Sequence, residues 1–345
     1  MEWHRELKMK MASLSRRLKY GRRSPNPIPS IWREKDHLNG EPVDSLVAIF
    51  RTGGCRHFLD SGCTMCGYYT GALPRPIDED LAMEQVERLL SSHSGEPMVK
   101  VYTSGSILDP WEFPPTALRG LLDGLCGTVE AIVLESRPEF VTPSALQMLE
   151  GCGSRIYVAL GLESVNEFVR NVLINKDLSM EAYQRAVSLL RSEGFGIKVY
   201  VLLKPPFLTE REAMADSIAT IKFALGHADI VSLNPVNVQS GTVVEYLWKR
   251  GLYRPPWLWT VVEVLKVGKG SGRVLVSHPT APGRPRGPHN DGSDDREVSE
   301  AIYRFSWTQD YSYLEIDGPS RRKWAAYIGF EDKAVMRGNV EEAIF

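Results

Sequence analysis

The sequence contains few cysteines and no long apolar segment. Its 345 residues include five cysteines, an odd number, and no run of about 18 apolar residues that could span a membrane. No secretory signal sequence is recognisable at the beginning of the chain. We therefore expect neither a secreted disulfide scaffold nor a membrane protein, but a cytoplasmic protein whose cysteines are metal ligands or buried thiols.

The chain also carries nearly equal numbers of acidic and basic residues. Its net charge of −2 does not, taken as a whole, indicate a nucleic-acid-binding protein. Residues 1–23, however, carry eight Lys or Arg against two Glu, a charge of +6, and leave −8 for the remainder. Such a segment can pair with phosphate, and a solvated helix is the equally good alternative. Pro25, Pro27 and Pro29 then predict the end of that helix and a stiff connector.

Apolar runs and amphipathic segments alternate between about residues 45 and 250. Buried strands are predicted at 45–51, 98–103, 131–135, 156–162, 197–203 and 229–233. Helices are predicted at 80–91, 115–125, 143–149, 165–173, 180–192 and 210–225. Near-continuous apolar strands separated by amphipathic helices are typical of a parallel sheet, either in a barrel or in a doubly wound fold.

Polar side chains follow each predicted strand. In chain order they are the first cysteines, Ser104, Glu135, Glu163, Lys204 and Asn234. The C-terminal ends of parallel strands carry the chemistry of α/β folds. Because a barrel gathers these ends around one mouth, whereas an open sheet spreads them along an edge, we favour a barrel. Lys204 and Asn234 are then candidates for substrate contacts.

The pattern changes after about residue 250. A helix to about 267, a short strand at 273–277, a helix at 296–306 and a strand at 312–316 are predicted there. A long loop rich in proline and glycine lies at 279–296. We therefore divide the chain into a basic N-terminal extension and linker at 1–44, a barrel of six βα units at 45–250 and a small α+β region at 251–345.

Three of the cysteines lie close together in the chain. Cys55, Cys63 and Cys66 have the spacing Cys-x7-Cys-x2-Cys, and thiolates bind zinc or iron–sulfur clusters. A structural zinc site uses four ligands, and His57 is the obvious candidate for the fourth. Three cysteines without a clear fourth ligand suit a 4Fe–4S cluster that keeps one iron open for a substrate or cofactor. Zinc stays the alternative.

The other two cysteines stand alone. Cys126 ends an apolar segment, and Cys152 lies between two glycines. We expect both to be buried thiols that pack like small apolar side chains, with no part in a metal site.

Several sequence blocks resemble one known family. In chain order they are GCRHFLDSGCTMCGYY, YTSGSILDP, LESRPEF, LGLESVNEFV and VLLKPPFLTEREA, followed by RGPHN and AIYRFSWTQD. On these blocks the chain resembles the radical S-adenosylmethionine (SAM) superfamily and, within it, the radical SAM proteins of archaeosine biosynthesis. The common superfamily spacing is Cys-x3-Cys-x2-Cys, and this chain departs from it with seven residues between the first two cysteines.

This resemblance implies an α/β fold with a partial (β/α)6 radical SAM barrel. It implies a 4Fe–4S cluster held by Cys55, Cys63 and Cys66, with SAM on the open iron and an electron donor that reduces the cluster. The implied enzyme is a lyase. Its 5′-deoxyadenosyl radical takes a hydrogen from a lysine adduct of a 7-deazaguanine base in the tRNA D-loop, a C–N bond of the lysine breaks, and archaeosine remains. The implied partner is a transglycosylase-like subunit that attaches the lysine.

The resemblance also implies SAM-binding roles for six residues: Tyr68, Thr103, Ser104, Glu135, Glu163 and Lys176. Thr103 and Ser104 lie where the superfamily has a glycine-rich stretch that contacts the methionine amine, although a plain turn also explains them. Glu135 and Glu163 suit the amine or the ribose, or else a salt bridge with a loop arginine such as Arg137. Lys176 suits the SAM carboxylate or is a surface lysine, and Tyr68 packs on adenine or belongs to the loop core.

Three functions stay open at this point. They are the archaeosine lyase, another radical SAM tRNA-modifying enzyme of the Elongator-catalytic-subunit or methylthiotransferase type, and a non-catalytic iron–sulfur or zinc RNA-binding module. We expect tRNA to bind by electrostatic contacts with the basic N-terminal segment and with residues 321–324 (Arg-Arg-Lys-Trp). In the long loop, Arg284, Arg286 and His289 contact RNA or a partner, or are solvated.

Overall fold

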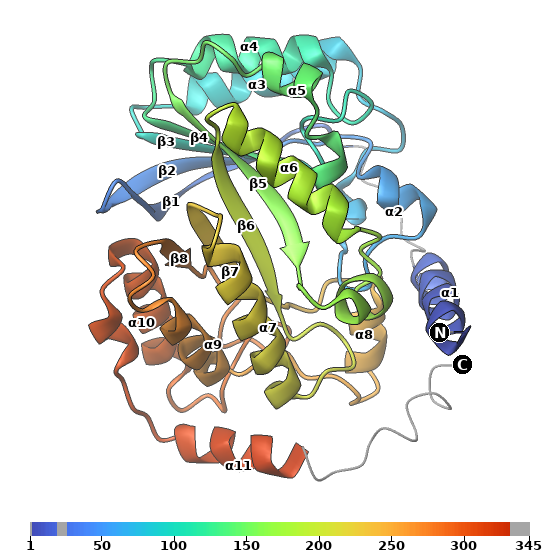
Figure 1. The fold of residues 1–345 in the computed structure, drawn as a ribbon, viewed down its shortest axis with the longest axis vertical. Coiled ribbons are helices and arrows are strands. Elements are labelled where there is room, and N and C mark those ends of the chain that lie inside the picture. The colour runs from blue at the N-terminus through green and yellow to red at the C-terminus, as the bar shows by residue number, and fades with distance from the viewer. Residues whose placement is uncertain (1, 19–25, 332–345) are drawn as a thin grey trace.

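One eight-stranded sheet organises the protein (Figure 1). The structure, a computed structural model, describes residues 2–18 and 26–331. Each strand pairs with the next one along the chain. The strands are β1 Ser30–Leu38, β2 Glu41–Ile49, β3 Met98–Tyr102, β4 Ala131–Ser136, β5 Arg155–Glu163, β6 Gly196–Leu203, β7 Ile230–Pro235 and β8 Val274–Val276. β1 is antiparallel to β2, and all later pairs are parallel.

The sheet curls into a half-barrel that helices cover from outside (Figure 1). In chain order, the α-helices of the described residues are α1 Glu2–Leu18, α2 Arg56–Asp60, α3 Glu79–Ser92, α4 Pro115–Leu125, α5 Pro143–Gln147, α6 Met180–Ser192, α7 Glu210–Leu225, α8 Val243–Trp248, α9 Leu258–Leu265, α10 Asp295–Thr308 and α11 Arg321–Glu331. Asp78, Thr142, Ser179 and Thr209 start four of them by accepting a hydrogen bond from the backbone N–H three residues later. The predicted fold class is confirmed.

The two faces of the sheet differ in composition. Alternate strand residues, such as Val99, Val101 and Val199, pack under the helices in the main apolar core. The residues between them point to the concave face, because successive side chains of a strand alternate. That face combines a small apolar cluster with polar side chains, among them Lys100, Tyr102, Glu135, Lys198 and Tyr200. The interior of the half-barrel is therefore suited to a polar ligand.

β1 is absent from the predicted strands, because its sequence SIWREKDHL is charged and follows the prolines. It forms a hairpin with β2. The turn residues Asn39 and Gly40 both have positive φ angles, 52° and 91°. Asn-Gly is a strong signal for a two-residue hairpin turn, so this strand was detectable. The hairpin adds an antiparallel edge to the predicted parallel sheet.

Three other segments differ from the prediction. The strand expected at 312–316 is wrong, because the 3-10 turn η5 (Tyr311–Leu314) lies there and Asp310 caps its first N–H groups. The helix expected at 165–173 is replaced by a shorter π-helical turn, η3 (Val169–Leu173). The short helix α8 was not predicted. The three-part division of the chain stays a prediction, and the sheet continues through both of its boundaries, since β1 precedes them and β8 follows them.

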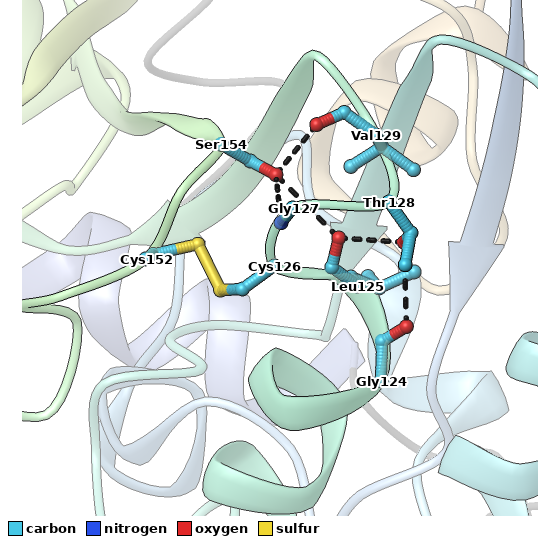
Figure 2. Close-up of a disulfide and its surroundings, with 8 residues drawn as sticks. All are labelled: Gly124, Leu125, Cys126, Gly127, Thr128, Val129, Cys152 and Ser154. Carbon is cyan, nitrogen blue, oxygen red and sulfur yellow. Dashed lines mark hydrogen bonds between the residues drawn. A yellow bond between two sulfur atoms is a disulfide. The ribbon is translucent and has the colours of Figure 1, made fainter.

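Cys126 and Cys152 form a disulfide (Figure 2), so the expectation of two buried thiols is wrong. They are 26 residues apart in the chain, and their Cα atoms are 5.0 Å apart. Next to the bond, the hydroxyl of Ser154 donates to the carbonyl of Val129 at 2.5 Å and accepts from the N–H of Gly127 at 2.9 Å. Only the fold brings the end of α4 beside the loop before β5, so the spacing of the cysteines could not reveal the pairing.

Within residues 2–18 and 26–331, no helix combines the length and the apolar character that crossing a membrane requires.

Candidate active site

The three clustered cysteines lie on the loop that follows β2. Cys55 directly precedes α2, and Cys63 and Cys66 follow it; all three keep their thiols and are partly exposed. Gly54 and Gly62 have φ angles of 89° and 73°, which glycine adopts without strain. They let the chain turn sharply on both sides of α2. As a result, Cys63 and Cys66 lie close enough to Cys55 to interact with it electrostatically.

The segment that follows η3 holds this loop in place. The N–H of Thr64 donates to the carbonyl of Ile174 at 2.9 Å, and the side chain of Asn175 donates to the carbonyl of Gly62 at 2.8 Å. Nε2 of His57 lies 2.6 Å from the carbonyl of Asn175, and burial lowers the pKa of His57 to about 4. The imidazole is therefore neutral and donates to the backbone through Nε2, so this nitrogen is not available as a fourth zinc ligand.

Burial and mutual proximity keep the thiols of Cys55 and Cys66 protonated at neutral pH. Desolvation, and then the neighbouring Cys63, raise the pKa of Cys66 to about 12. Desolvation also raises the pKa of Cys55. Arg137 and Lys176 are the nearby cations that oppose these shifts. Thiolates here therefore need a further positive charge, such as bound metal, to be stable.

The donor set fits an iron–sulfur cluster. The backbone N–H groups of Phe58 and Tyr68 donate to the sulfurs of Cys55 and Cys66, and hydrogen bonds to sulfur tune such clusters. Among the described residues, no three Cys, His, Asp or Glu side chains are drawn together tightly enough to hold a metal ion. A 4Fe–4S cluster does not need such a convergence, because each cysteine binds a different iron of the cluster.

The turn after β3 lies directly against the cysteine loop. A Cβ atom on Gly105 would lie 2.7 Å from Cβ of Cys55 and 2.5 Å from the carboxylate of Glu112, so only glycine fits there. The hydroxyl of Thr103 accepts from the N–H of Gly105 at 3.2 Å, which shapes the turn. Ser104 lies at its partly exposed tip. The predicted SAM-binding stretch thus adjoins the first cysteine.

Glu112 braces this turn, and the sequence offered no motif that would identify it. Its carboxylate accepts from the N–H of Ser106 at 2.7 Å and from the hydroxyl of Thr52 at 3.0 Å. Desolvation raises the pKa of Glu112 to about 7. Because Thr52 precedes the cysteine loop, Glu112 connects the ends of β2 and β3.

Glu163 and Lys176 form a buried ion pair at the same mouth. Nζ lies 2.9 Å from Oε1, and each side chain is 10% exposed. Glu163 ends a bulged strand with φ of 65°, a strained value for a residue other than glycine. A Cβ atom on Gly161 would lie 2.5 Å from Nζ of Lys176, so the pair lies over this glycine. Lys176 is therefore not a surface lysine, and Arg137 pairs with Glu139 and not with Glu163.

Glu135 and Tyr68 line the mouth as well. The carboxylate of Glu135 has no hydrogen-bond or ion-pair partner among the described residues, and desolvation raises its pKa to about 8. Tyr68 as a residue is 55% exposed, whereas desolvation of its hydroxyl, followed by the charge of Cys66, raises its pKa to about 12. Gln239 was not among the residues predicted from the sequence. Its side chain accepts a hydrogen bond from the N–H of Gly67 at 2.6 Å and forms a hydrogen bond with the hydroxyl of Tyr68.

The basic N-terminal helix packs against this loop (Figure 1). Met11 and Leu14 of α1 are buried in a cluster with residues of η3 and α8. The hydroxyl of Ser15 donates to the carbonyl of Gly62 at 3.2 Å. The helix is therefore not simply solvated, although Arg16 and Arg17 on its other side are exposed. The remaining charges of the predicted basic segment, at 19–23, and Pro25 lie outside the described residues.

Several further candidate residues are already paired with other side chains. Lys204 is buried and lies 2.6 Å from Glu210 of α7, so it does not serve the mouth. Asn234 is partly exposed at the end of β7 and accepts from the hydroxyl of Ser232 at 2.9 Å. Arg286 pairs with Glu245 at 2.8 Å.

His289 of the long loop and two side chains of α11 also make contacts within the protein. His289 lies 2.7 Å from the carbonyl of Gly287, whereas Arg284 is exposed. In α11, Arg321 pairs with Glu263 at 2.7 Å. The indole N–H of Trp324 donates to Thr260 at 2.8 Å. These two side chains of the predicted tRNA-binding segment therefore hold α11 against α9.

Comparison with known proteins identifies the family. No protein-family model matches the chain. It is 36% identical over 319 residues to archaeosine synthase subunit beta of Methanosarcina acetivorans, with 90% of this chain and 92% of the relative covered. It is 37% identical over 308 residues to archaeosine synthase subunit beta of Thermococcus kodakarensis, with 86% and 95% covered. The chain belongs to the archaeosine synthase subunit beta family.

The resemblance read from the sequence blocks is thereby confirmed. Among solved structures, the chain is similar to Elp3 of Methanocaldococcus infernus, with a TM-score of 0.46 at 16% identity, over 65% of this chain and 57% of that one.

Proposed function

We propose that this protein is the radical SAM lyase subunit of an archaeosine synthase in the cytoplasm. Its substrate is the lysine adduct of a 7-deazaguanine base in the tRNA D-loop, and its product is archaeosine. The observation that carries the proposal is the meeting of three thiols with the Glu163–Lys176 pair at the mouth of the half-barrel. This meeting occurs in a chain of the archaeosine synthase subunit beta family.

Cys55, Cys63 and Cys66 would hold a 4Fe–4S cluster whose remaining iron takes SAM. With an electron donor, the bound cluster and SAM would supply a 5′-deoxyadenosyl radical, which would take a hydrogen atom from the lysine side chain, giving 5′-deoxyadenosine and a lysine radical whose C–N bond then breaks. The protein binds and orients the reactants and excludes water from the radical. The residues proposed to bind SAM are Tyr68, Thr103, Ser104, Glu135, Glu163 and Lys176.

The chemistry of these side chains suggests which part of SAM each of them binds. Lys176 offers a cation to the SAM carboxylate, and Glu163 holds the lysine ammonium in place. The unpaired carboxylate of Glu135 suits an ammonium or a ribose diol. The exposed ring of Tyr68 offers an aromatic face to adenine. Thr103 and Ser104 present the turn that contacts the methionine amine.

Two partners belong to the proposal. A transglycosylase-like subunit attaches lysine to the tRNA before this protein acts. The tRNA itself is bound in part through the exposed arginines of α1, which lie on the helix that covers the cysteine loop.

The test is anaerobic reconstitution with iron and sulfide, followed by reduction with dithionite in the presence of SAM and lysine-modified tRNA. We expect 5′-deoxyadenosine and archaeosine in the digested tRNA. SAM cleavage without archaeosine would instead indicate another radical SAM tRNA-modifying enzyme. Zinc in the purified protein, with no SAM cleavage, would indicate a non-catalytic RNA-binding module.

A further inference from the structure

Lys198 is a buried cation that has no carboxylate paired with it among the described residues and lies 5.8 Å from the centre of the Tyr200 ring. It lies on β6, and only 4% of it is exposed. Its ammonium group makes no hydrogen bond or ion pair with any residue in 2–18 or 26–331. Burial lowers the pKa of Lys198, with Asp36 as the main opposing charge. A lysine in such a place is costly unless an anion joins it.

The carboxylates below Lys198 are already occupied. Oδ2 of Asp36 lies 2.5 Å from Nζ of Lys100, and its Oδ1 accepts from the N–H of His37 at 2.9 Å. Glu34 also lies 2.5 Å from Nζ of Lys100. These contacts occupy the carboxylates at the bottom of the half-barrel, so Lys198 forms no ion pair with them, although Asp36 is the charge that acts on it most strongly.

The register of the sheet places Lys198 and Glu135 in one row. Ala159 of β5 pairs with Glu135 on one side and with Lys198 on the other. All three side chains point to the concave face, and the alanine between the two long side chains is small. The phenol of Tyr200, one residue pair further toward the mouth, is hydrogen-bonded to Tyr102. An anion reaching this row would meet Lys198 with two phenols beside it.

Lys198 is distinct from the cations of the cysteine loop. Arg137 and Lys176 are the groups that act on the thiols, and Lys176 is bound to Glu163. Lys198 instead interacts with Glu135 and with the charges at the bottom of the half-barrel. The anion that it would bind is therefore not the carboxylate of a SAM molecule held beside the cysteines.

We propose that Lys198 binds the α-carboxylate of the lysine that the substrate carries. This inference rests on the proposed function, because the lysine adduct is the ligand. The base would stay at the mouth while the flexible methylene chain enters the half-barrel and brings its carboxylate to Lys198. Lys198 is then a residue that determines specificity for an amino acid over a simple amine.

The experiment compares two tRNA ligands on the reconstituted protein. One carries the lysine adduct, and the other carries the adduct of 1,5-diaminopentane, which has the same amine and methylene chain but no carboxylate. We expect the wild type to bind the lysine adduct about 10- to 100-fold more tightly, as one charge-assisted contact provides. Lys198→Met should abolish this preference, and Lys222→Met, an exposed lysine of α7, should keep it.

Equal binding of both adducts by the wild type would contradict the inference even if archaeosine is formed. A preference that disappears in Lys198→Met would support it even if no archaeosine is formed. Thermal unfolding separates a structural role: Lys198→Met should melt no lower than wild type, because it removes an unpaired buried charge. A melting temperature several degrees lower would make Lys198 a counter-ion of Asp36 and overturn the proposal.

Discussion

Nζ of Lys176 lies 2.9 Å from Oε1 of Glu163, and the pair packs against Gly161, where a side chain would collide with Nζ. Burial opposes the charge of Lys176, but the Glu163 carboxylate more than compensates and raises its pKa. The ammonium group of Lys176 therefore stays charged inside the mouth. The ion pair connects the end of β5 with the segment that clamps the cysteine loop, so one contact serves both the fold and the proposed SAM site.

Removal of the lysine should leave a buried carboxylate without its partner. We expect Lys176→Met to lower the free energy of unfolding by about 3 kcal/mol and to weaken SAM binding. Chemical denaturation and calorimetric titration measure the two effects. The matched control is Arg304→Met, whose pair with Glu300 is more than half exposed, so its loss should change the free energy of unfolding very little. Unchanged stability and SAM affinity in Lys176→Met would show that the pair is not needed.

The raised pKa of Glu135, about 8, makes stability depend on pH. The folded protein holds this proton more tightly than the unfolded chain, in which a glutamate titrates near 4.5. Stability should therefore fall as the pH rises from about 5 to 8. Glu112, with a pKa of about 7, contributes in the same direction. We expect Glu135→Gln to flatten the profile and Glu150→Gln, at an exposed position, to leave it unchanged; a profile equally steep in Glu135→Gln would contradict this.

The disulfide should contribute to stability by restricting the unfolded chain. Closing a loop between cysteines 26 residues apart stabilises a protein by roughly 3 kcal/mol. We expect the double variant Cys126→Ser/Cys152→Ser to lose that amount in urea denaturation without reductant. The wild type should lose the same amount when a reductant is added, and the variant should not respond. A wild type insensitive to reductant would argue against the bond.

The exposed arginines of α1 should contact tRNA. Because α1 also covers the cysteine loop, substitution is a cleaner test than deletion of the helix. We expect Arg16→Ser/Arg17→Ser to weaken tRNA binding and to reduce the slope of log affinity against log salt by about 1 for each lost phosphate contact. Arg88→Ser/Lys222→Ser, on the outer helices α3 and α7, is the control. An unchanged salt slope would remove α1 from the tRNA interface.

Local sequence signals were sufficient for the parallel part of the fold. Helices α4, α6 and α7 have the predicted bounds: α4 begins at a proline, and Ser179 and Thr209 cap α6 and α7. β1 was not predicted although Asn39-Gly40 marks its turn, because its many charged residues interrupt the apolar pattern expected of a strand. The polar residues at the strand ends could be named because parallel strands place them at one edge.

Features that depend on contacts distant in sequence could not be predicted. The Cys126–Cys152 bond, the bracing role of Glu112 and the isolation of Lys198 all follow from which loops and side chains the fold brings together. The partner of Glu163 was uncertain for the same reason. From the sequence, a loop arginine such as Arg137 was its alternative ion-pair partner, whereas Glu163, at the end of a bulged strand, pairs with Lys176.

The central claim is that Cys55, Cys63 and Cys66 hold a cluster that cleaves SAM. The most direct test is the iron content of anaerobically reconstituted protein, measured with the 5′-deoxyadenosine that it releases under dithionite. We predict four irons per chain and SAM cleavage for the wild type and for Cys126→Ala, and loss of both for Cys63→Ala. Full iron content in Cys63→Ala, or zinc in place of iron in the wild type, would contradict the account.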